Sequence, residues 1–417
     1  MEEVLSQFEQ YTKTERVRKG LIFWLALIFI FLFQEFFYVK DNNILYILSK
    51  VVIGVLSLIV FVVYFLKILV TKRLPEYSWY LVFIFLFLVI ISATSSYYYF
   101  HQPYIMGIVA QIKLTGVFYY FFMFAILRGF NVTLRELELT FFCVGMFFLI
   151  TYITIDLSFN PQKYWTQESD IIVHDSKGYR FRWPDVFITI LTFYTFRKMV
   201  ANFNLIRLSV FLLTYGYVLV LSGERLYLCC VTAVLGITIF FKSNASIKIF
   251  LLGLSVVIIV WLVNGGFDFI AENVNTASLD TRLVTTTNAS KFISAQFDHL
   301  LFGGGNLNEL WLNGFARIYG NSFFLSDIGW VGICYEFGLI GALVCLSLYI
   351  VLFIDVKKTL RPGKTILMLT LRDYLLFRLL ESSLSPGIPY YIGIFTSILA
   401  ISVFVRYYIR PYKVAAL

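Results

Sequence analysis

Six arginines at or near the ends of long apolar runs are the residues of this chain best suited to chemistry. A guanidinium group keeps its charge and presents a planar fork of donors, which binds a phosphate group bidentately. If several of these side chains converged at one membrane face, they would form a binding site for a diphosphate. The six residues are Arg180, Arg182, Arg225, Arg282, Arg317 and Arg378.

Each charged residue near these runs also has a simpler explanation. A single arginine beside a membrane can pair with a lipid head group or with a nearby acid. Arg378 and Glu381 are three residues apart, so on a helix they can form a structural pair on one face. Lys113, Arg372 and Asp373 lie within apolar runs. An ionisable residue is costly there and needs either a partner or a function.

The sequence does not indicate a metal, nucleotide or disulfide site. His101, His174 and His299 each stand alone, and the five cysteines lie in apolar runs with no spacing typical of zinc ligands or disulfides. The glycine run at 303–305 follows no predicted strand and lacks the Lys-Ser/Thr of a nucleotide-binding loop. We therefore expect no cofactor and no metal.

The composition excludes a soluble globular domain. Of the 417 residues, 59% are hydrophobic and only 14% are charged, and the mean hydropathy is +0.81. A soluble domain carries about 25% charged residues. The net charge of +9 does not indicate nucleic acid binding, because the basic residues occur as short clusters between apolar runs. Such clusters orient membrane proteins.

The apolar runs predict an all-α polytopic membrane protein of about twelve transmembrane helices, each needing about 20 apolar residues. Lysine and arginine are more frequent in the segments that lie on one side if the N-terminus is inside, so both termini are expected in the cytoplasm. The first span is expected to be retained rather than cleaved as a signal peptide. The predicted spans are 20–39, 44–66, 79–99, 104–127, 137–156, 184–199, 205–222, 226–241, 247–263, 328–353, 365–382 and 388–405.

Residues 1–417 are predicted to form a single membrane domain with two long outer loops. The first periplasmic loop is expected at 157–183, and the large periplasmic loop at 264–327, between spans 9 and 10. A long outer loop in a compact membrane protein is more often functional than a simple connector.

Four short segments, taken in their order and topological positions, suggest a family. They are Leu-Ser-Gly-Glu-Arg at 221–225, Asp-Thr-Arg-Leu at 280–283, Leu-Phe-Gly-Gly-Gly at 301–305, and the stretch from Asn321 to Trp330 that continues into Tyr-Glu-Phe-Gly-Leu-Ile-Gly at 335–341. Together they resemble the superfamily of Wzy-type O-antigen polymerases and O-antigen ligases. The motifs cover about 205–353, and the rest of the chain is similar in span count only.

The resemblance implies a membrane-embedded, inverting and metal-independent glycosyltransferase of the bacterial inner membrane, with its active site facing the periplasm. Its substrates would be undecaprenyl-diphosphate-linked glycans, and its other partners would be membrane lipids, a chain-length regulator and a flippase. Arg225 and Arg282 are the first choices for binding the lipid diphosphate. Arg180, Arg182, Arg317 and Arg378 would support them.

Ligases of this superfamily typically carry a His-Asn pair where the large loop re-enters the membrane. Here the matching residues are Gly320, Asn321 and Ser322, without a histidine, which favours a polymerase over a ligase. The departure also leaves the general base unassigned. The candidates are Asp327, Asp280, Glu336 and His299.

Three alternatives stay open. The chain can be a ligase that transfers the glycan to the lipid A core. It can be a flippase or another transporter. The charged residues within apolar runs, Lys113, Arg372 and Asp373, support this alternative. The sequence has no repeat that would make two similar halves, which transporters often have. It can also be an assembly protein without catalytic activity, in which the arginines would be incidental.

Overall fold

The computed structural model describes residues 17–33, 44–71, 78–158, 172–175, 178–181, 185–221, 225–242, 276–320, 323–359, 365–383 and 390–414. The described part is built almost wholly of helices, as the sequence predicts. These are α2 (Lys19–Leu32), α3 (Ile44–Thr71), α4 (Ser78–Phe100), α5 (Tyr104–Val109), η1 (Ile112–Thr115), α6 (Gly116–Gly129), α7 (Leu134–Ser158), α9 (Asp185–Ala201), α10 (Leu205–Leu221), α11 (Arg225–Lys242), α14 (Thr276–Ala295), α15 (Phe297–Phe302), α16 (Ala316–Tyr319), η3 (Leu325–Ile328), α17 (Gly329–Thr359), α18 (Ile366–Glu381) and α19 (Ile392–Val414).

The helical membrane character is confirmed. Among the described residues, 4 helical segments are long and apolar enough to cross a membrane: Trp79–Phe100, Ile112–Gly129, Leu134–Ile155 and Leu325–Lys358. Helices also occupy most of the other predicted spans where these are described; residues 34–39, 184, 222, 247–263, 388 and 389 lie outside the described residues. The total of twelve spans and their orientation stay predictions.

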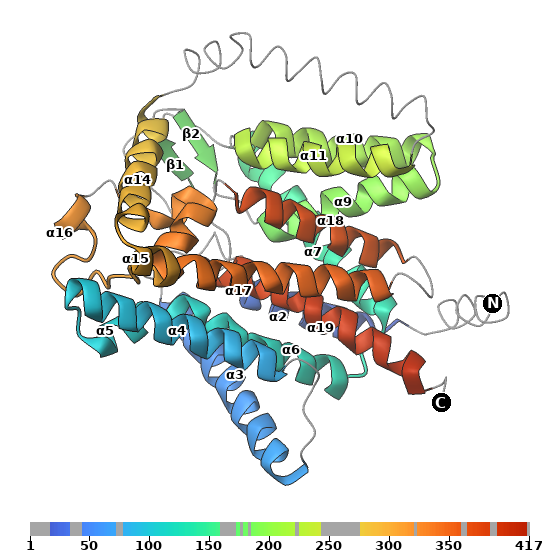
Figure 1. Ribbon diagram of the computed structural model, residues 1–417. Helices are drawn as coiled ribbons and strands as arrows, with labels where there is room; N and C mark the ends of the chain where they lie inside the picture. Colours follow the sequence, from blue (N-terminus) through green and yellow to red (C-terminus); the bar gives the residue numbers. More distant parts are fainter. Residues whose placement is uncertain are drawn as a thin grey trace.

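The first predicted outer loop contains a short hairpin that the sequence analysis did not predict. Strands β1 (Ile172–Asp175) and β2 (Gly178–Phe181) pair antiparallel, with Ile172 opposite Phe181. Figure 1 shows this hairpin, α14, α15 and α16 gathered at one end of the helices, while α19 ends at the opposite end. Elements from both predicted outer loops therefore lie at the same end of the molecule.

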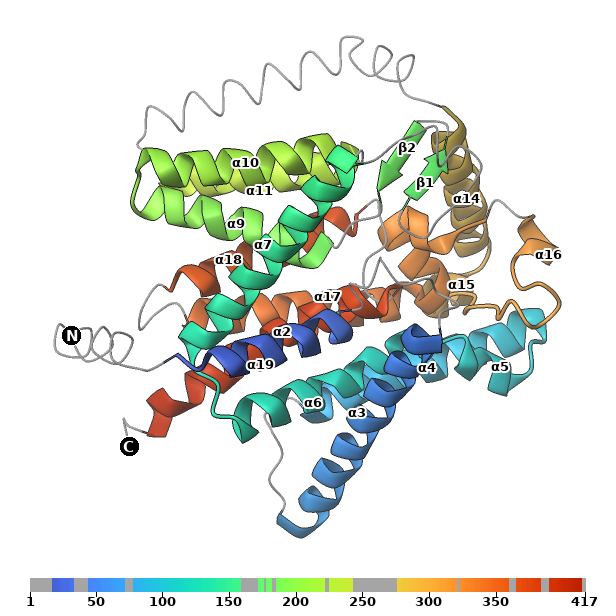
Figure 2. The same ribbon diagram turned by 180° about the vertical axis from the view of Figure 1, so that it is seen from behind.

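Helix α17 crosses the centre of the bundle and contacts five other α-helices. It packs against α4, α14, α15, α18 and α19. In the two views, α9, α10 and α11 lie on one side of α17, and α4, α5 and α6 lie on the other (Figures 1 and 2). Buried phenylalanines fill the core; Phe29, for example, packs against Phe141 and Phe404 at ring-centroid distances of 5.7 Å.

The predicted span at 104–127 is not one continuous helix. It is divided into α5, η1 and α6, with the break at Ala110 and Gln111. Helix α5 lies close against α4, where a Cβ atom on Gly107 would approach the Cα atom of Ala93 to 2.8 Å. The hydropathy of the segment is high enough for a span, but the polar side chains of Gln111 and Lys113 have partners on α17. The break lets both side chains reach these partners.

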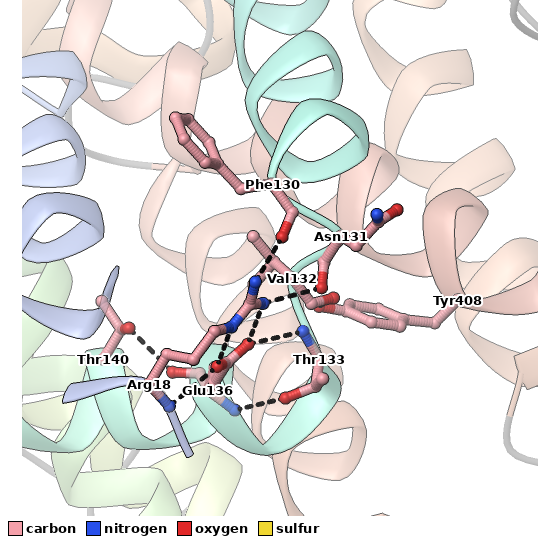
Figure 3. Close-up of polar contacts among 8 residues, drawn as sticks. All are labelled: Arg18, Phe130, Asn131, Val132, Thr133, Glu136, Thr140 and Tyr408. Atoms are coloured by element: carbon pink, nitrogen blue, oxygen red, sulfur yellow. Dashed lines mark hydrogen bonds and ion pairs between the residues drawn. The ribbon is translucent and has the colours of Figure 1, made fainter. Parts of the chain in front are cut away.

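Arg18, just before α2, is held by the turn between α6 and α7 and by the start of α7 (Figure 3). Its Nε and Nη2 atoms donate to the two carboxylate oxygens of Glu136 at 2.8 and 2.9 Å. The same carboxylate accepts from the backbone N–H of Thr133, while the Thr133 hydroxyl accepts from the N–H of Glu136. This is a capping box of the type Thr-x-x-Glu, and it begins α7. Tyr408 of α19 donates to the carbonyl of Val132 in the same turn.

Candidate functional site

The glycine run at 303–305 packs against a break in α17. Gly338 interrupts the helix with φ +68° and ψ −180°, a backbone conformation open essentially to glycine alone. The N–H groups of Gly304 and Gly305 donate to the carbonyls of Tyr335 and Glu336 at 2.6 and 3.0 Å. A helical carbonyl normally accepts from the N–H four residues later. The break in the helix therefore leaves these two carbonyls available to the glycine run at 303–305.

Glycine is required on both sides of this contact. A Cβ atom on Gly338 would lie 2.1 Å from the carbonyl oxygen of Leu301. A Cβ atom on Gly303, which has φ +71°, would lie 2.5 Å from the carbonyl oxygen of Tyr335. Two segments that carry the family resemblance, 301–305 and 335–341, therefore form a single structural unit. We call it the glycine joint.

Helix α4 and Gln102, two residues beyond its end, hold the other side of the glycine joint. Ser92 accepts a hydrogen bond from the backbone N–H of Asn306 at 3.0 Å. Gln102, which is fully buried, donates to the Asn306 carbonyl at 3.1 Å and accepts from the N–H of Asn308 at 2.7 Å. These bonds fix the path of the large loop as it leaves the joint.

Glu336 lies directly under the glycine joint and is the centre of a buried polar cluster. Its side chain is 0% exposed, and the Nζ atom of Lys113 lies 2.8 Å from its carboxylate. The Nε2 atom of Gln111 donates to the carboxylate at 2.6 Å and to Ser92 at 2.7 Å. A carboxylate with 0% exposure is stable only when paired and hydrogen-bonded, as it is here.

The same cluster contains two buried polar atoms that have no hydrogen-bond partner among the described residues. They are the Oε1 atom of Gln111 and the hydroxyl oxygen of Tyr390. The ammonium of Lys113 also lies 4.4 Å from the ring centroid of Tyr390, close enough for a cation–π contact. The cluster joins η1, α4, α17 and the segment before α19, so it couples helices that are distant in the sequence.

Helix α14 covers the start of α17 and carries Arg282. The hydroxyl of Thr285 on α14 accepts from the N–H of Phe324 at 3.4 Å, and Ala289 of the same helix is buried in a cluster with Tyr335. The Nε atom of Arg282 is buried without a hydrogen-bond partner in the described part of the chain. A buried donor of this kind favours binding an acceptor group, because an unmet donor costs free energy.

His299 is held in one orientation beside the glycine joint. Its ring stacks on Phe292 at 4.1 Å with an interplanar angle of 5° and meets Tyr99 edge-on at 4.5 Å. Its Nδ1 atom lies 2.9 Å from the carbonyl oxygen of Phe292. A carbonyl only accepts hydrogen bonds, so Nδ1 carries a proton in this contact, and Nε2 is the ring nitrogen left for another partner.

The remaining candidates occupy different environments. Asp327, in η3, is partly exposed and accepts from the hydroxyl of Ser326 at 3.0 Å. Arg317, in α16, is exposed. Arg378 is 1% exposed and donates to Glu381 at 2.6 Å and to Tyr374 at 2.8 Å. The geometry of Arg378 fits the structural pair with Glu381, and a role in diphosphate binding stays a prediction for it.

The side chains of four predicted site residues lie outside the described part of the chain. Arg182 lies outside the described residues. Arg180 is in β2, Arg225 begins α11 and Asp280 is in α14, but their side chains lie outside the described part. Whether Arg225 and Arg282 approach each other therefore stays a prediction.

The sequence analysis missed Gln111, Ser92 and Gln102. The only signal was the pair of polar residues, Gln111 and Lys113, within an apolar run. The other charges that are predicted to lie within spans have partners: Asp373 accepts from Arg197 at 2.6 Å, and Arg372 also reaches Asp373 at 3.2 Å. Among the described residues, no three His, Cys, Asp or Glu side chains form a group that could hold a metal ion.

No family model and no curated protein matches this chain.

Proposed function

We propose that this protein is a surface polysaccharide polymerase of the bacterial inner membrane. It would transfer a nascent glycan from undecaprenyl diphosphate to a lipid-linked acceptor repeat unit, with inversion and without a metal. One observation carries the proposal. Helix α14, which carries segment 280–283, packs against α17, and segment 301–305 is hydrogen-bonded to segment 335–341 of α17. These are three of the segments on which the resemblance depends.

In this proposal, Arg282 binds the diphosphate together with Arg225, supported by Arg180, Arg182 and Arg317. Charge builds on the diphosphate as its bond to the anomeric carbon breaks. Guanidinium donors that are already in place stabilise that charge more in the transition state than in the ground state. The buried, unpartnered Nε of Arg282 supports its place in this set.

The acceptor hydroxyl would attack the anomeric carbon while a base takes its proton and the diphosphate leaves with the bonding electron pair. His299 and Asp327 are the bases that the geometry favours, because both are partly accessible. Glu336 is fully buried and already neutralised by Lys113. We assign Glu336 to positioning the glycine joint rather than to proton transfer.

The same proposal includes a membrane topology and two protein partners for the polymerase. About twelve spans with both termini in the cytoplasm would present α14, α15 and the glycine joint to the periplasm. A flippase would deliver the lipid-linked repeat units, and a chain-length regulator would end polymerisation.

A transporter, such as a flippase for lipid-linked oligosaccharides, is the second candidate. Two interrupted helices, α5–η1–α6 and α17, meet at the buried Lys113–Glu336 pair. Broken helices around buried charges are typical of transporter binding sites. The breaks lie near one end of each helix rather than at its middle, which favours the polymerase.

Deletion of the gene in the native host, followed by gel analysis of surface polysaccharide, tests the proposal. Polymerase loss is expected to leave single repeat units on the surface. Long unattached chains would instead indicate a ligase. Lipid-linked units accumulating in the cytoplasm would indicate a flippase, and an unchanged polysaccharide would contradict all three activities.

A further inference from the structure

A groove of about 640 Å³ runs along α4 and ends beside α15. This volume is in the range of ligand pockets, about 300–1,000 Å³. Most of the groove is apolar and is lined by residues such as Phe83, Phe87 and Ile90. Phe83 and Ile90 are 59% and 53% exposed, so no described helix covers this face.

The length of the groove suits a single hydrocarbon chain. Its lining extends along α4 from Phe83 to Tyr99, a distance of about 24 Å at a helical rise of 1.5 Å per residue. Helix α4 is long and apolar enough to cross a membrane, so in a bilayer this face would meet lipid chains rather than water.

The end of the groove next to α15 is polar and negatively charged. Ser95, Tyr99 and Asp298 line it, and the Tyr99 hydroxyl donates to the Asp298 carboxylate at 2.7 Å. This hydrogen bond lowers the pKa of Asp298, so the carboxylate is ionised at neutral pH. An ionised carboxylate has about four lone-pair sites, so it can accept further hydrogen bonds beside the one from Tyr99.

We propose that the groove is a binding site for a phospholipid with a primary ammonium head group, such as phosphatidylethanolamine. One acyl chain would lie along α4, and the ammonium would donate to Asp298. Tyr98, which is 69% exposed at the same end, adds an aromatic face for the cation. The proposal does not depend on the polymerase activity.

The charge of Asp298 also distinguishes this site from the one proposed for the substrate. A polyprenyl diphosphate would place its phosphates beside a carboxylate, which repels them. Arginines suit that head group, and none of the residues that line the groove is an arginine or a lysine.

Native mass spectrometry of the purified full-length protein, with defined lipids added, tests the proposal. The wild type is expected to retain phosphatidylethanolamine about tenfold better than phosphatidylglycerol, since a hydrogen bond to a charged group discriminates by about this factor. Asp298→Asn is expected to remove the preference. Glu309→Gln, which neutralises an exposed acid outside the groove, is the matched control and is expected to keep it.

A second variant tests the hydrocarbon part of the site. Ile90→Trp places a large ring in the middle of the groove and is expected to lower retention of both lipids several-fold. Equal retention of the two phospholipids by the wild type would overturn the proposal. So would an unchanged preference in Asp298→Asn, tighter retention of a polyprenyl diphosphate in the groove, or unchanged retention in Ile90→Trp.

Discussion

At the scale of single residues, the pairing of Lys113 with Glu336 is the feature with the largest energetic consequence. Moving either charge out of water costs several kcal/mol, and the loss is offset only while the partner and its hydrogen bonds remain. Gln111 contributes a further hydrogen bond to the carboxylate. Removing one charge therefore leaves the other buried and uncompensated.

Glu336→Gln is expected to destabilise the protein by about 3–5 kcal/mol, because it leaves the ammonium of Lys113 unpaired. The double variant Lys113→Met with Glu336→Leu is expected to be more stable than Glu336→Gln, since an apolar pair carries no desolvation cost. Thermal unfolding of the purified proteins in detergent measures both. Glu309→Gln is the control for removal of an exposed acid. A double variant less stable than Glu336→Gln would show that the ion pair is not the source of the effect.

Sequence analysis singled out both charges but could not pair them. Lys113 was notable because it interrupts an apolar run, and Glu336 because of its motif. The two residues are separated by 223 positions. Only the packing of η1 against α17 brings them together, and no local pattern encodes that contact.

At the scale of elements, the glycine joint depends on backbone geometry rather than on side chains. Both Gly303 and Gly338 have positive φ, and each faces backbone atoms of the other segment. Neither contact can relax by rotating a side chain. The joint therefore has no room for a single added methyl group at either glycine.

Gly338→Ala is expected to destabilise the fold by about 1–3 kcal/mol through backbone strain alone, with a further cost from the clash with Leu301, and to abolish polysaccharide formation. Gly236→Ala is the matched control. A Cβ atom there meets nothing within 4 Å, and alanine favours a helix more than glycine does. Thermal unfolding and complementation of the deletion strain measure the two effects. A Gly338→Ala variant as stable as the wild type would contradict the claim that the glycine joint requires glycine at this position.

The helices were largely predictable from the long apolar runs. In a bilayer, a helix satisfies all the backbone hydrogen bonds of such a run within the segment itself. The break at Gln111 and the β1–β2 hairpin were not predictable. The break depends on a hydrogen bond to Glu336, 225 residues away, and the hairpin spans only 172–181 within a predicted loop. Short elements of this kind carry too few residues to give a periodic signal.

At the scale of the whole molecule, the predicted orientation places the two ends of the bundle on opposite sides of the membrane. The loop between α9 and α10 is predicted to face the cytoplasm, and the segment after the glycine joint the periplasm. Phe203 and Leu310 represent these two regions and are 69% and 84% exposed. Their side chains are accessible enough to report the side on which each lies.

Cysteines introduced at these two positions, in a background without the five native cysteines, test the orientation. With a membrane-impermeant maleimide, Leu310→Cys is expected to be labelled once the outer membrane is permeabilised. Phe203→Cys is expected to be labelled only after the inner membrane is opened as well. The reverse pattern would invert the topology and move the proposed site to the cytoplasm.

The most direct test of the central claim is polymerisation by the purified protein reconstituted into liposomes with lipid-linked repeat units. We predict that the wild type forms longer glycans on the lipid without added lipid A core. Arg282→Ala is expected to slow this by about 10²–10³-fold, while Arg128→Ala, which removes an exposed arginine in the last turn of α6, keeps the wild-type rate. Chain growth at an equal rate in Arg282→Ala, or none in the wild type, would contradict the account.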